Sequence, residues 1–500
     1  MLKTATAAAL GLLLSMGVAQ AQTLRFGLAE DPDALDPTMG RTFVGRIVFS
    51  AMCDKLVDIS PDLKVVPQLA TEWTWSDDGK VLTMKLRPNV LFHDGEKFDA
   101  AAAKFSLDRH LTMAGSQRRG EISAVKQVDV VDDLTIRLTL GAPFAPLMAQ
   151  LTDRAGMMVS PKAAQALGDK FATAPVCAGP FKFVERVAQD RIVVEKFDQY
   201  WNKDAIKLKR IEFRPFTDNS VKLANLRAGQ LDMIERLAAT DVPEVKKDPK
   251  LKFASIVELG YQGITINTNN SDKSKSPIGQ SEKVREAFEL SLDRQAIVQV
   301  VFNGEYQPGN QWLSPLNPNY DKAFPIPKRD VAKAKALLKE AGVTNPVVNL
   351  MTPTTGEQQQ LAQVIQAMTK EAGFDVKIQA TEFASSLNLA EKGDFEAYLL
   401  AWSGRTDPDG NLYNFVACKG PLNYGKYCKP EVDALLDQSR STTDIEARRK
   451  AWNGVAKATL ADRPVIYLFH RKWLWAHTTK LTGFTEYPDG LVRFAGITLN

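Results

Sequence analysis

The stretch from residue 69 to residue 106 constrains the fold of this chain most, because three elements can be identified in it in order. Trp73 and Trp75 alternate with polar residues, which is typical of a half-buried strand. Asp78-Gly79 favours a tight turn, since glycine tolerates the positive φ that hairpins require, and a second alternating strand follows. Asp99 then stands where it can cap a helix with one apolar face, made by Ala100, Ala103, Leu107 and Leu111. The stretch therefore predicts a β-hairpin followed by a helix.

Several short motifs of this stretch occur in a characteristic order and spacing: Ala70, Trp73, Asp78-Gly79, Leu86-Arg87, Phe92-His93-Asp94-Gly95 and Phe105-Ser106. In this arrangement the chain resembles the bacterial extracellular solute-binding proteins of the peptide-binding type, solute-binding family 5. Further similar segments lie at 174–181, 200–203, 228–232 and 284–294. The resemblance therefore extends from about Gln22 over nearly the whole chain.

The resemblance implies an α/β fold with two lobes, that of a type II periplasmic binding protein with an extra subdomain in the larger lobe. A length of 500 residues agrees with this, because it exceeds what one hydrophobic core usually organises. We expect lobe I over 22–259, with the subdomain at about 46–174. Lobe II is expected over 260–472, with a return to lobe I over 473–500.

The same resemblance implies a function in transport. The protein would capture a small molecule or peptide between its lobes and deliver it to an inner-membrane ABC permease. From the resemblance we expect a monomer that needs no cofactor and has no nucleic-acid partner. The net charge of +4 is also too small and too evenly spread to indicate nucleic-acid binding.

Residues 1–21 have the pattern of a secretory signal peptide. Lys3 gives a charged start, residues 7–18 are apolar, and Ala19-Gln20-Ala21 is a small-x-small cleavage site. No cysteine follows this site, so the pattern lacks the signature of a lipid anchor. The sequence therefore predicts a periplasmic protein that begins near Gln22.

Export determines how the four cysteines are interpreted. In an oxidising compartment an even number of cysteines favours disulfides over metal or redox sites, and no CxxC spacing occurs. Cys418 and Cys428 share one loop and are expected to pair, which leaves Cys53 for Cys177. The alternative is four free thiols.

Sequence motifs for catalysis are absent. The chain has no GxSxG, HExxH, phosphate-loop or strand-linked GxGxxG motif, and its four histidines are scattered. We therefore predict a binding protein with no enzymatic activity and no metal site. Two alternatives from other classes are an exported hydrolase with a similar cleft and a periplasmic chaperone.

The segment after the predicted strand 395–402 is the main candidate for ligand recognition. In peptide-binding relatives, an acidic residue three positions after the matching tryptophan pairs with the free amine of the peptide. Here Trp402 is followed at that offset by Arg405, which prefers an anionic partner such as a carboxylate. Asp407 or Asp409 would hold an amine. The alternative is that Arg405 pairs with one of these acids inside its own loop.

Four further residues are candidates for the cleft. Arg41 and Phe43 follow an Asp-Pro segment that lies near the ligand in the family, and Tyr261 stands beside the predicted crossover. Thr354 belongs to a strand-to-helix joint whose free N–H groups suit a carboxylate. Alternatively, Arg41 is a solvated charge, Tyr261 is a core aromatic, and the joint only caps its helix. Taken together, these residues predict a small peptide or a peptide-like acidic solute as ligand.

Overall fold

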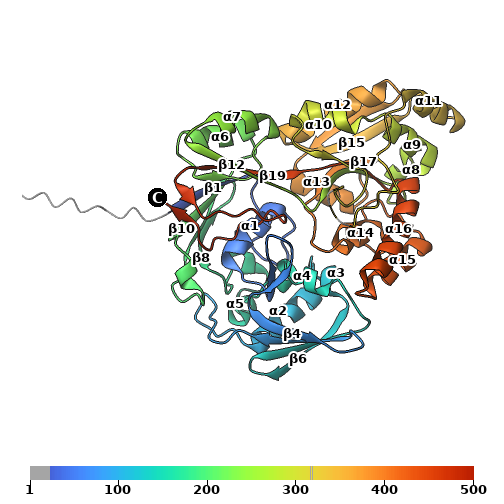
Figure 1. Ribbon diagram of the computed structural model, residues 1–500. Helices are drawn as coiled ribbons and strands as arrows, with labels where there is room; N and C mark the ends of the chain where they lie inside the picture. Colours follow the sequence, from blue (N-terminus) through green and yellow to red (C-terminus); the bar gives the residue numbers. More distant parts are fainter. Residues whose placement is uncertain (1–22, 316, 318) are drawn as a thin grey trace, which may run out of the picture.

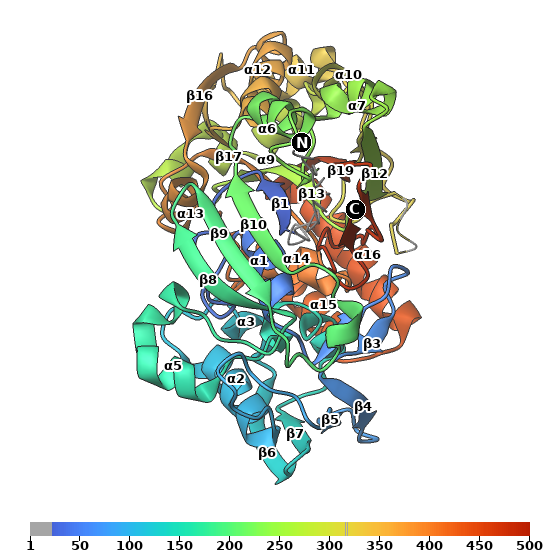
Figure 2. The same ribbon diagram turned by 90° about the vertical axis from the view of Figure 1, so that its left-hand side faces the viewer.

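The computed structural model describes residues 23–315, 317 and 319–500, so the predicted signal peptide lies outside the described residues. The chain forms two lobes and a subdomain, each built on its own sheet (Figure 1). The subdomain lies below both lobes in Figure 1, and Figure 2 shows it extending from the long strands of lobe I.

Lobe I contains a seven-stranded mixed sheet in the order β12-β19-β11-β1-β10-β9-β8. β1 runs parallel to β10 and β11, and the other neighbours are antiparallel. Its strands are β1 (Thr23–Leu28), β8 (Phe181–Val187), β9 (Arg191–Lys196), β10 (Arg210–Pro215), β11 (Met233–Ile234), β12 (Leu251–Val257) and β19 (Lys472–Thr478). The lobe also holds α1 (Phe43–Met52), α6 (Asn219–Arg227), α7 (Val242–Lys247) and a small pair of strands, β20 (Leu481–Thr482) and β21 (Thr498–Leu499).

The sheet of lobe I is covered on both faces. Trp473 and Trp475 of β19 pack in one hydrophobic cluster with α1, while Leu474 and Ala476 pack in another with α6 and α7. This alternation is the period of two that a β-strand imposes on its side chains. The strand is therefore apolar along its length because both of its faces are buried.

Lobe II contains a six-stranded sheet in the order β14-β18-β13-β17-β15-β16. The strand-to-helix joint that contains Thr354 belongs to a strand–helix–strand unit, since β15 and β16 are parallel and α12 joins them. The strands are β13 (Tyr261–Ile266), β14 (Gln307–Pro308), β15 (Val347–Pro353), β16 (Asp375–Thr381), β17 (Ala397–Trp402) and β18 (Val465–His470). The helices are α8 (Pro277–Gln280), α9 (Glu282–Leu290), α10 (Arg294–Phe302), α11 (Val331–Glu340), α12 (Gly356–Lys370), α13 (Phe383–Glu391), α14 (Asp409–Val416), α15 (Pro430–Arg440) and α16 (Ile445–Asp462).

The subdomain contains the hairpin and helix that the sequence predicts. Its four-stranded antiparallel sheet has the order β4-β5-β7-β6, and Asp99 caps α2 by accepting a hydrogen bond from the N–H of Ala102 at 2.9 Å. The elements are β4 (Ala70–Trp75), β5 (Val81–Leu86), β6 (Val125–Asp132), β7 (Thr135–Leu140), α2 (Ala100–Thr112), α3 (Arg119–Ile122), α4 (Leu147–Gln150), α5 (Pro161–Leu167) and a separate pair, β2 (Val57–Ile59) and β3 (Val65–Pro67).

The first long helix is shorter than the apolar pattern from Phe43 to Leu56 suggests. It ends at Met52, and Cys53 has an extended backbone. The carbonyl of Met52 accepts a hydrogen bond from the N–H of Gly179 at 2.8 Å. The chain leaves the helix here because it pairs with a distant segment, which periodicity alone does not reveal.

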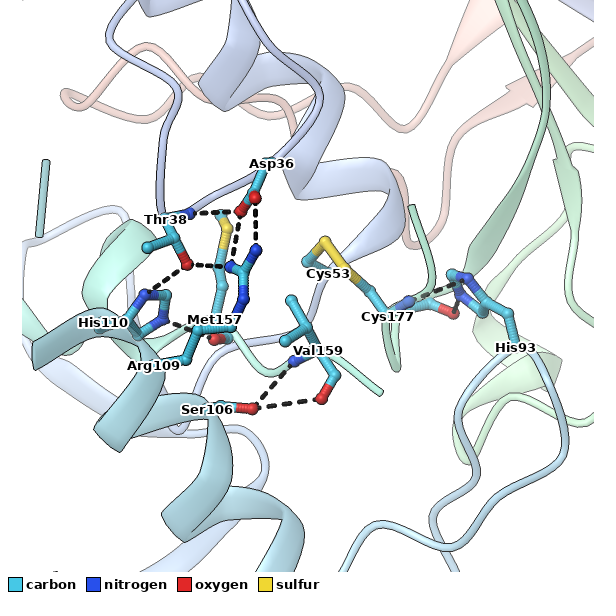
Figure 3. Close-up of a disulfide and its surroundings, with 11 residues drawn as sticks. Asp36, Thr38, Cys53, His93, Ser106, Arg109, His110, Met157, Val159 and Cys177 are labelled. Carbon is cyan, nitrogen blue, oxygen red and sulfur yellow. Dashed lines mark hydrogen bonds and ion pairs between the residues drawn. A yellow bond between two sulfur atoms is a disulfide. The ribbon is translucent and has the colours of Figure 1, made fainter. Parts of the chain in front are cut away.

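Both predicted disulfides are present, Cys53–Cys177 and Cys418–Cys428. Cys53–Cys177 fastens the end of α1 to the segment that precedes β8 (Figure 3). His93 contacts the same segment, because its Nε2 lies 3.1 Å from the carbonyl of Gly179. The disulfide therefore fixes the junction between lobe I and the subdomain.

A buried polar network beside this disulfide holds the segment that leads to Arg41 (Figure 3). Arg109 donates two hydrogen bonds to the carboxylate of Asp36, at 2.9 and 2.6 Å. The ring of His110 lies between the hydroxyl of Thr38 at 2.9 Å and the carbonyl of Met157 at 3.1 Å. Because a carbonyl only accepts, Nε2 of His110 carries the proton and Nδ1 accepts from Thr38.

None of the helices in the described part of the chain combines the length and the apolar character that crossing a membrane would require.

The network predicts a pH dependence of stability. Burial lowers the pKa of His110 to about 4. In the unfolded chain the same group titrates near 6.5, so the unfolded state binds more protons between these two values and stability falls as the pH falls. We expect the contribution of His110 to decline by about 2 kcal/mol from pH 7 to pH 5. Urea denaturation of wild type and His110→Gln at pH 7 and pH 5 measures this contribution. If the free energy of unfolding changed equally with pH in the two proteins, the prediction would be wrong.

Candidate functional site

A cavity lies between the two lobes and the subdomain. It contains about 1750 Å³ of empty space, part of which is open to solvent. Its wall is formed by residues of lobe I such as Phe43 and Arg236, of the subdomain such as Arg118, and of lobe II such as Trp402 and Glu357. A molecule in this cavity would therefore touch all three parts of the protein.

The two connections between the lobes lie side by side at the cavity. The N–H of Glu258 donates to the carbonyl of Arg471 at 3.0 Å, and Nε of Arg471 lies 3.2 Å from the carboxylate of Glu258. Nδ1 of His470 lies 2.6 Å from the carbonyl of Gly260. Such paired, short connections allow one lobe to rotate against the other, as in a hinge.

Four buried arginines surround two acids at the subdomain side of the cavity. We call this group the arginine cluster: Arg46, Arg118, Arg154 and Arg405 with Asp153 and Glu121. Asp153 lies 3.0 Å from Nε of Arg46 and 3.0 Å from Nε of Arg405, while Glu121 lies 2.7 Å from Nη1 of Arg118. Four guanidinium groups face two carboxylates, so the cluster has a net charge of +2.

The arginine cluster keeps the carboxylate of Asp153 ionised although this side chain is buried. Burial alone would raise the pKa of Asp153, but the guanidinium groups of Arg46, Arg405 and Arg154 hold it well below its usual range. Burial lowers the pKa of Arg405 to about 10, so this side chain stays cationic at neutral pH. The cluster is thus a fixed, positively charged wall of the cavity.

The local structure after β17 aims Arg405 at this wall. Gly404 has a φ of 80°, and a Cβ there would meet the backbone of Leu259 at 2.3 Å, so only glycine fits. The side chain of Asn411 accepts hydrogen bonds from the indole of Trp402 at 2.9 Å and from the N–H of Arg405 at 2.8 Å. The guanidinium of Arg405 then lies over the Trp402 ring, 4.4 Å from its centroid.

The structure decides against one of the two alternatives that the sequence left open for Arg405. Arg405 lines the cavity, and its ion-pair partner is Asp153 of the subdomain and not an acid of its own loop. Asp407 accepts two hydrogen bonds from Arg448, at 2.8 and 2.7 Å, and Asp409 is bound by Arg440. Pairing inside the loop is therefore wrong, and Asp407 is engaged outside the lining of the cavity.

Three other predicted residues line the cavity: Arg41, Phe43 and Trp402. Arg41 crosses between the lobes, because it donates to Glu391 at 2.9 Å and to Asn388 at 3.1 Å, both on α13. Phe43 stacks on Trp473, with ring centroids 4.2 Å apart. Arg41 is thus ion-paired with lobe II at a partly exposed site.

Tyr261 and Thr354 do not line the cavity. Tyr261 is buried between Phe415 and Tyr467, with ring centroids at 5.8 and 4.8 Å, so it is a core aromatic. Thr354 is exposed, and its neighbour Thr355 reaches the cavity wall instead. The joint between β15 and α12 therefore places Thr355 at the cavity, where the sequence predicted Thr354.

Sequence reasoning missed most of the charged lining: Glu30, Arg118, Glu121, Arg154, Arg236, Glu357 and Arg471. One signal for Arg471 was present, because it lies two residues before Trp473, which marks the predicted return to lobe I. For the others no local pattern separates them from the many solvated charges of the chain.

The described residues hold no group of three or more His, Cys, Asp or Glu side chains placed to bind a metal ion.

Comparison with known proteins identifies the family. Residues 64–423 match the model of the bacterial extracellular solute-binding proteins, family 5, middle region. The chain belongs to this family. Over 476 residues it is 30% identical to the glutathione-binding protein GsiB of Pectobacterium atrosepticum. The aligned residues cover 92% of this chain and 91% of that protein.

Solved structures agree with this assignment. The periplasmic binding protein AgaA of A. tumefaciens R10, in complex with agropinic acid, is 29% identical with a TM-score of 0.86, over 96% of this chain and 99% of that one. DppA of Helicobacter pylori, in complex with the peptide STSA, is 25% identical with a TM-score of 0.87, over 95% and 98% of the two chains. Like its relatives, this family 5 protein has the two-lobed fold and is the solute-binding component of an ABC importer, working with a membrane permease.

The arginine cluster predicts the stability of one variant. Asp153→Asn removes the carboxylate that three guanidinium groups share, and leaves buried cations uncompensated. We expect the free energy of unfolding to fall by about 3–5 kcal/mol. Asp129→Asn is the matched control, because Asp129 pairs with Arg137 at a partly exposed site and should change stability by less than about 1 kcal/mol. Urea denaturation compares them, and equal stability of the two variants would contradict the assignment.

Proposed function

We propose that the solute is a small acidic, peptide-like molecule, and that one of its anionic groups binds at the arginine cluster. The net charge of +2 in a buried wall of the cavity carries this proposal, because an unpaired buried charge is costly and an anion offsets it. Arg405, Arg118 and Arg154 line the cavity and are the donors nearest to such a group. A charge-assisted hydrogen bond in this setting contributes about 1.5–3 kcal/mol.

The body of the solute would lie on aromatic side chains. Three aromatic side chains line the cavity: Phe43, Trp402 and Trp473. The rings of Phe43 and Trp473 are stacked on each other. Flat rings give a large apolar contact area with few rotatable bonds. The ligands of the relatives support an acidic or peptide-like solute: glutathione for GsiB, agropinic acid for AgaA and the peptide STSA for DppA.

In this proposal the protein captures its solute and does no chemistry on it. After cleavage of residues 1–21 it would act in the periplasm as a monomer. Residues 22–259 and 473–500 would move as one body and residues 260–472 as the other, about the connections at Glu258 and Arg471. Binding closes the lobes only because the solute contacts the closed form better than the open one.

The proposal predicts what the purified protein carries. Mass spectrometry of small molecules released by denaturation should find an acidic solute in a one-to-one ratio. Arg405→Ala should weaken its binding at least about tenfold in titration calorimetry. Arg449→Ala is the control, since Arg449 lies at the surface on α16 and is not part of the lining, and should leave affinity unchanged.

Two results would contradict it. Hydrolysis of peptides or esters by the purified protein would favour an exported hydrolase. Binding of unfolded proteins without saturable binding of any small molecule would favour a chaperone.

A further inference from the structure

One loop of lobe II is closed by a disulfide and lies at the cavity. We call residues 418–428, between α14 and α15, the disulfide loop, because Cys418 and Cys428 join its two ends. Three of its residues line the cavity: Pro421, Leu422 and Tyr424. The cross-link therefore fixes the ends of a segment whose middle forms part of the cavity wall.

The disulfide loop also touches the subdomain. A Cβ placed on Gly120, in α3, would lie 3.3 Å from Cγ of Pro421, so these two residues are in contact. In Figure 1 the helices that flank the loop, α14 and α15, lie next to α3. Elsewhere in the loop, Tyr424 packs on α13, the helix that pairs with Arg41 of lobe I. The contact of Pro421 with α3 exists only when lobe II and the subdomain are together.

The two disulfides of the chain differ in their exposure to solvent. Cys53 and Cys177 are 2% and 0% exposed, whereas Cys428 is exposed and Cys418 is half-buried. Thiol–disulfide exchange begins when a thiolate attacks one of the two sulfurs, so its rate depends on access to that sulfur. A dithiol in solution can therefore reach Cys428, while the packed interior shields the other bridge.

Hydrogen bonds hold the base of the disulfide loop independently of the sulfurs. The side-chain amide of Asn423 donates to the carbonyl of Ala417 at 2.8 Å and to that of Tyr427 at 2.6 Å. The carbonyl of Gly425 accepts two hydrogen bonds from backbone N–H groups just after β13, at 3.0 and 2.9 Å. Loss of the disulfide should therefore leave the fold of lobe II intact and increase the freedom of the loop around Pro421.

We propose that Cys418–Cys428 is a redox-sensitive switch that sets how tightly the cavity is held closed. In the bridged form the ends of the loop are fixed, and Pro421 is held against α3. In the reduced form the loop has more conformations, so ordering it around a closed cavity costs more conformational entropy. The reduced protein therefore closes less and holds its solute more weakly.

The reductant is a dithiol, and the exchange proceeds in two steps. A thiolate of the dithiol attacks Sγ of Cys428, which breaks the S–S bond, forms a mixed disulfide and releases Cys418 as a thiolate that takes up a proton. The second thiol of the reductant then attacks the mixed disulfide and releases Cys428, which is also protonated. Two electrons and two protons pass from the dithiol to the protein, and the dithiol leaves as its own disulfide.

Alkylation tests which bridge reacts. The purified protein is treated with increasing dithiothreitol at neutral pH, alkylated and analysed by peptide mass spectrometry. We expect alkylated thiols at Cys418 and Cys428 at dithiothreitol concentrations that leave Cys53–Cys177 intact. Reduction of both bridges in parallel, or of Cys53–Cys177 first, would overturn the inference.

Hydrogen exchange tests whether the loop controls closure. In reduced wild type we expect amide exchange at least about threefold faster both in the loop and in residues 118–124 of the subdomain, which contain no cysteine. The double variant Cys418→Ser with Cys428→Ser should match reduced wild type, and dithiothreitol should not change it further. Faster exchange confined to the loop would indicate a purely local cross-link and overturn the inference, as would a response of the double variant to dithiothreitol.

Retention of the bound molecule gives a second readout, which rests on the proposed function. The probe is the acidic molecule that the protein carries from the cell, measured by mass spectrometry during dialysis. Reduced wild type and the double variant should lose it about tenfold faster than bridged wild type. Equal loss from all three would overturn the inference.

Failure of the switch and failure of the proposed function can be distinguished. If the protein carries no small molecule, the proposed function fails, while hydrogen exchange still decides whether the disulfide controls closure. If it carries an acidic molecule and retains it equally with and without the disulfide, capture of an acidic solute stands and the switch fails.

Discussion

The ion pair between Arg405 and Asp153 joins the two halves of the solute cavity. Arg405 follows β17 of lobe II, while Asp153 lies beside α1 and α4 in the subdomain that extends from lobe I. The pair exists only when the two sides are together, and it is supported by Arg46, which donates to Ser403 at 3.2 Å, and by Arg41 with Glu391. Closure of this family 5 protein therefore assembles its most positively charged wall, which we propose is completed by an acidic group of the solute.

Features that depend on neighbouring residues could be predicted from the sequence. The hairpin around Gly79, the cap at Asp99 and the parallel unit of β15 and β16 follow from turn geometry, capping and periodicity, which act over a few residues. The disulfide pairs followed from export and from the shared loop of Cys418 and Cys428. The transport role came from the order of motifs that the chain shares with its family.

The partners of the charged residues could not be predicted in the same way. Arg405 had two acids within four residues, yet Arg448 and Arg440 engage these acids from other helices and leave Arg405 to Asp153. Packing of distant elements decides among carboxylates that look equivalent in sequence. The end of α1 at Met52 has a similar cause, since the carbonyl of Met52 accepts a hydrogen bond from a segment more than a hundred residues away. The sequence thus singled out Trp402 and Arg405, which line the cavity, but the partners of the charged residues around them depend on the fold.

We propose that an acidic solute holds the lobes together through the arginine cluster. Small-angle X-ray scattering tests it most directly, on protein freed of solute by denaturation and refolding and then on the same protein with its released solute added back. We expect a smaller radius of gyration with solute for wild type, and a much smaller change for Arg405→Ala at the same solute concentration. An unchanged radius of wild type at saturating solute, or full closure of the variant at the same low concentration, would contradict it.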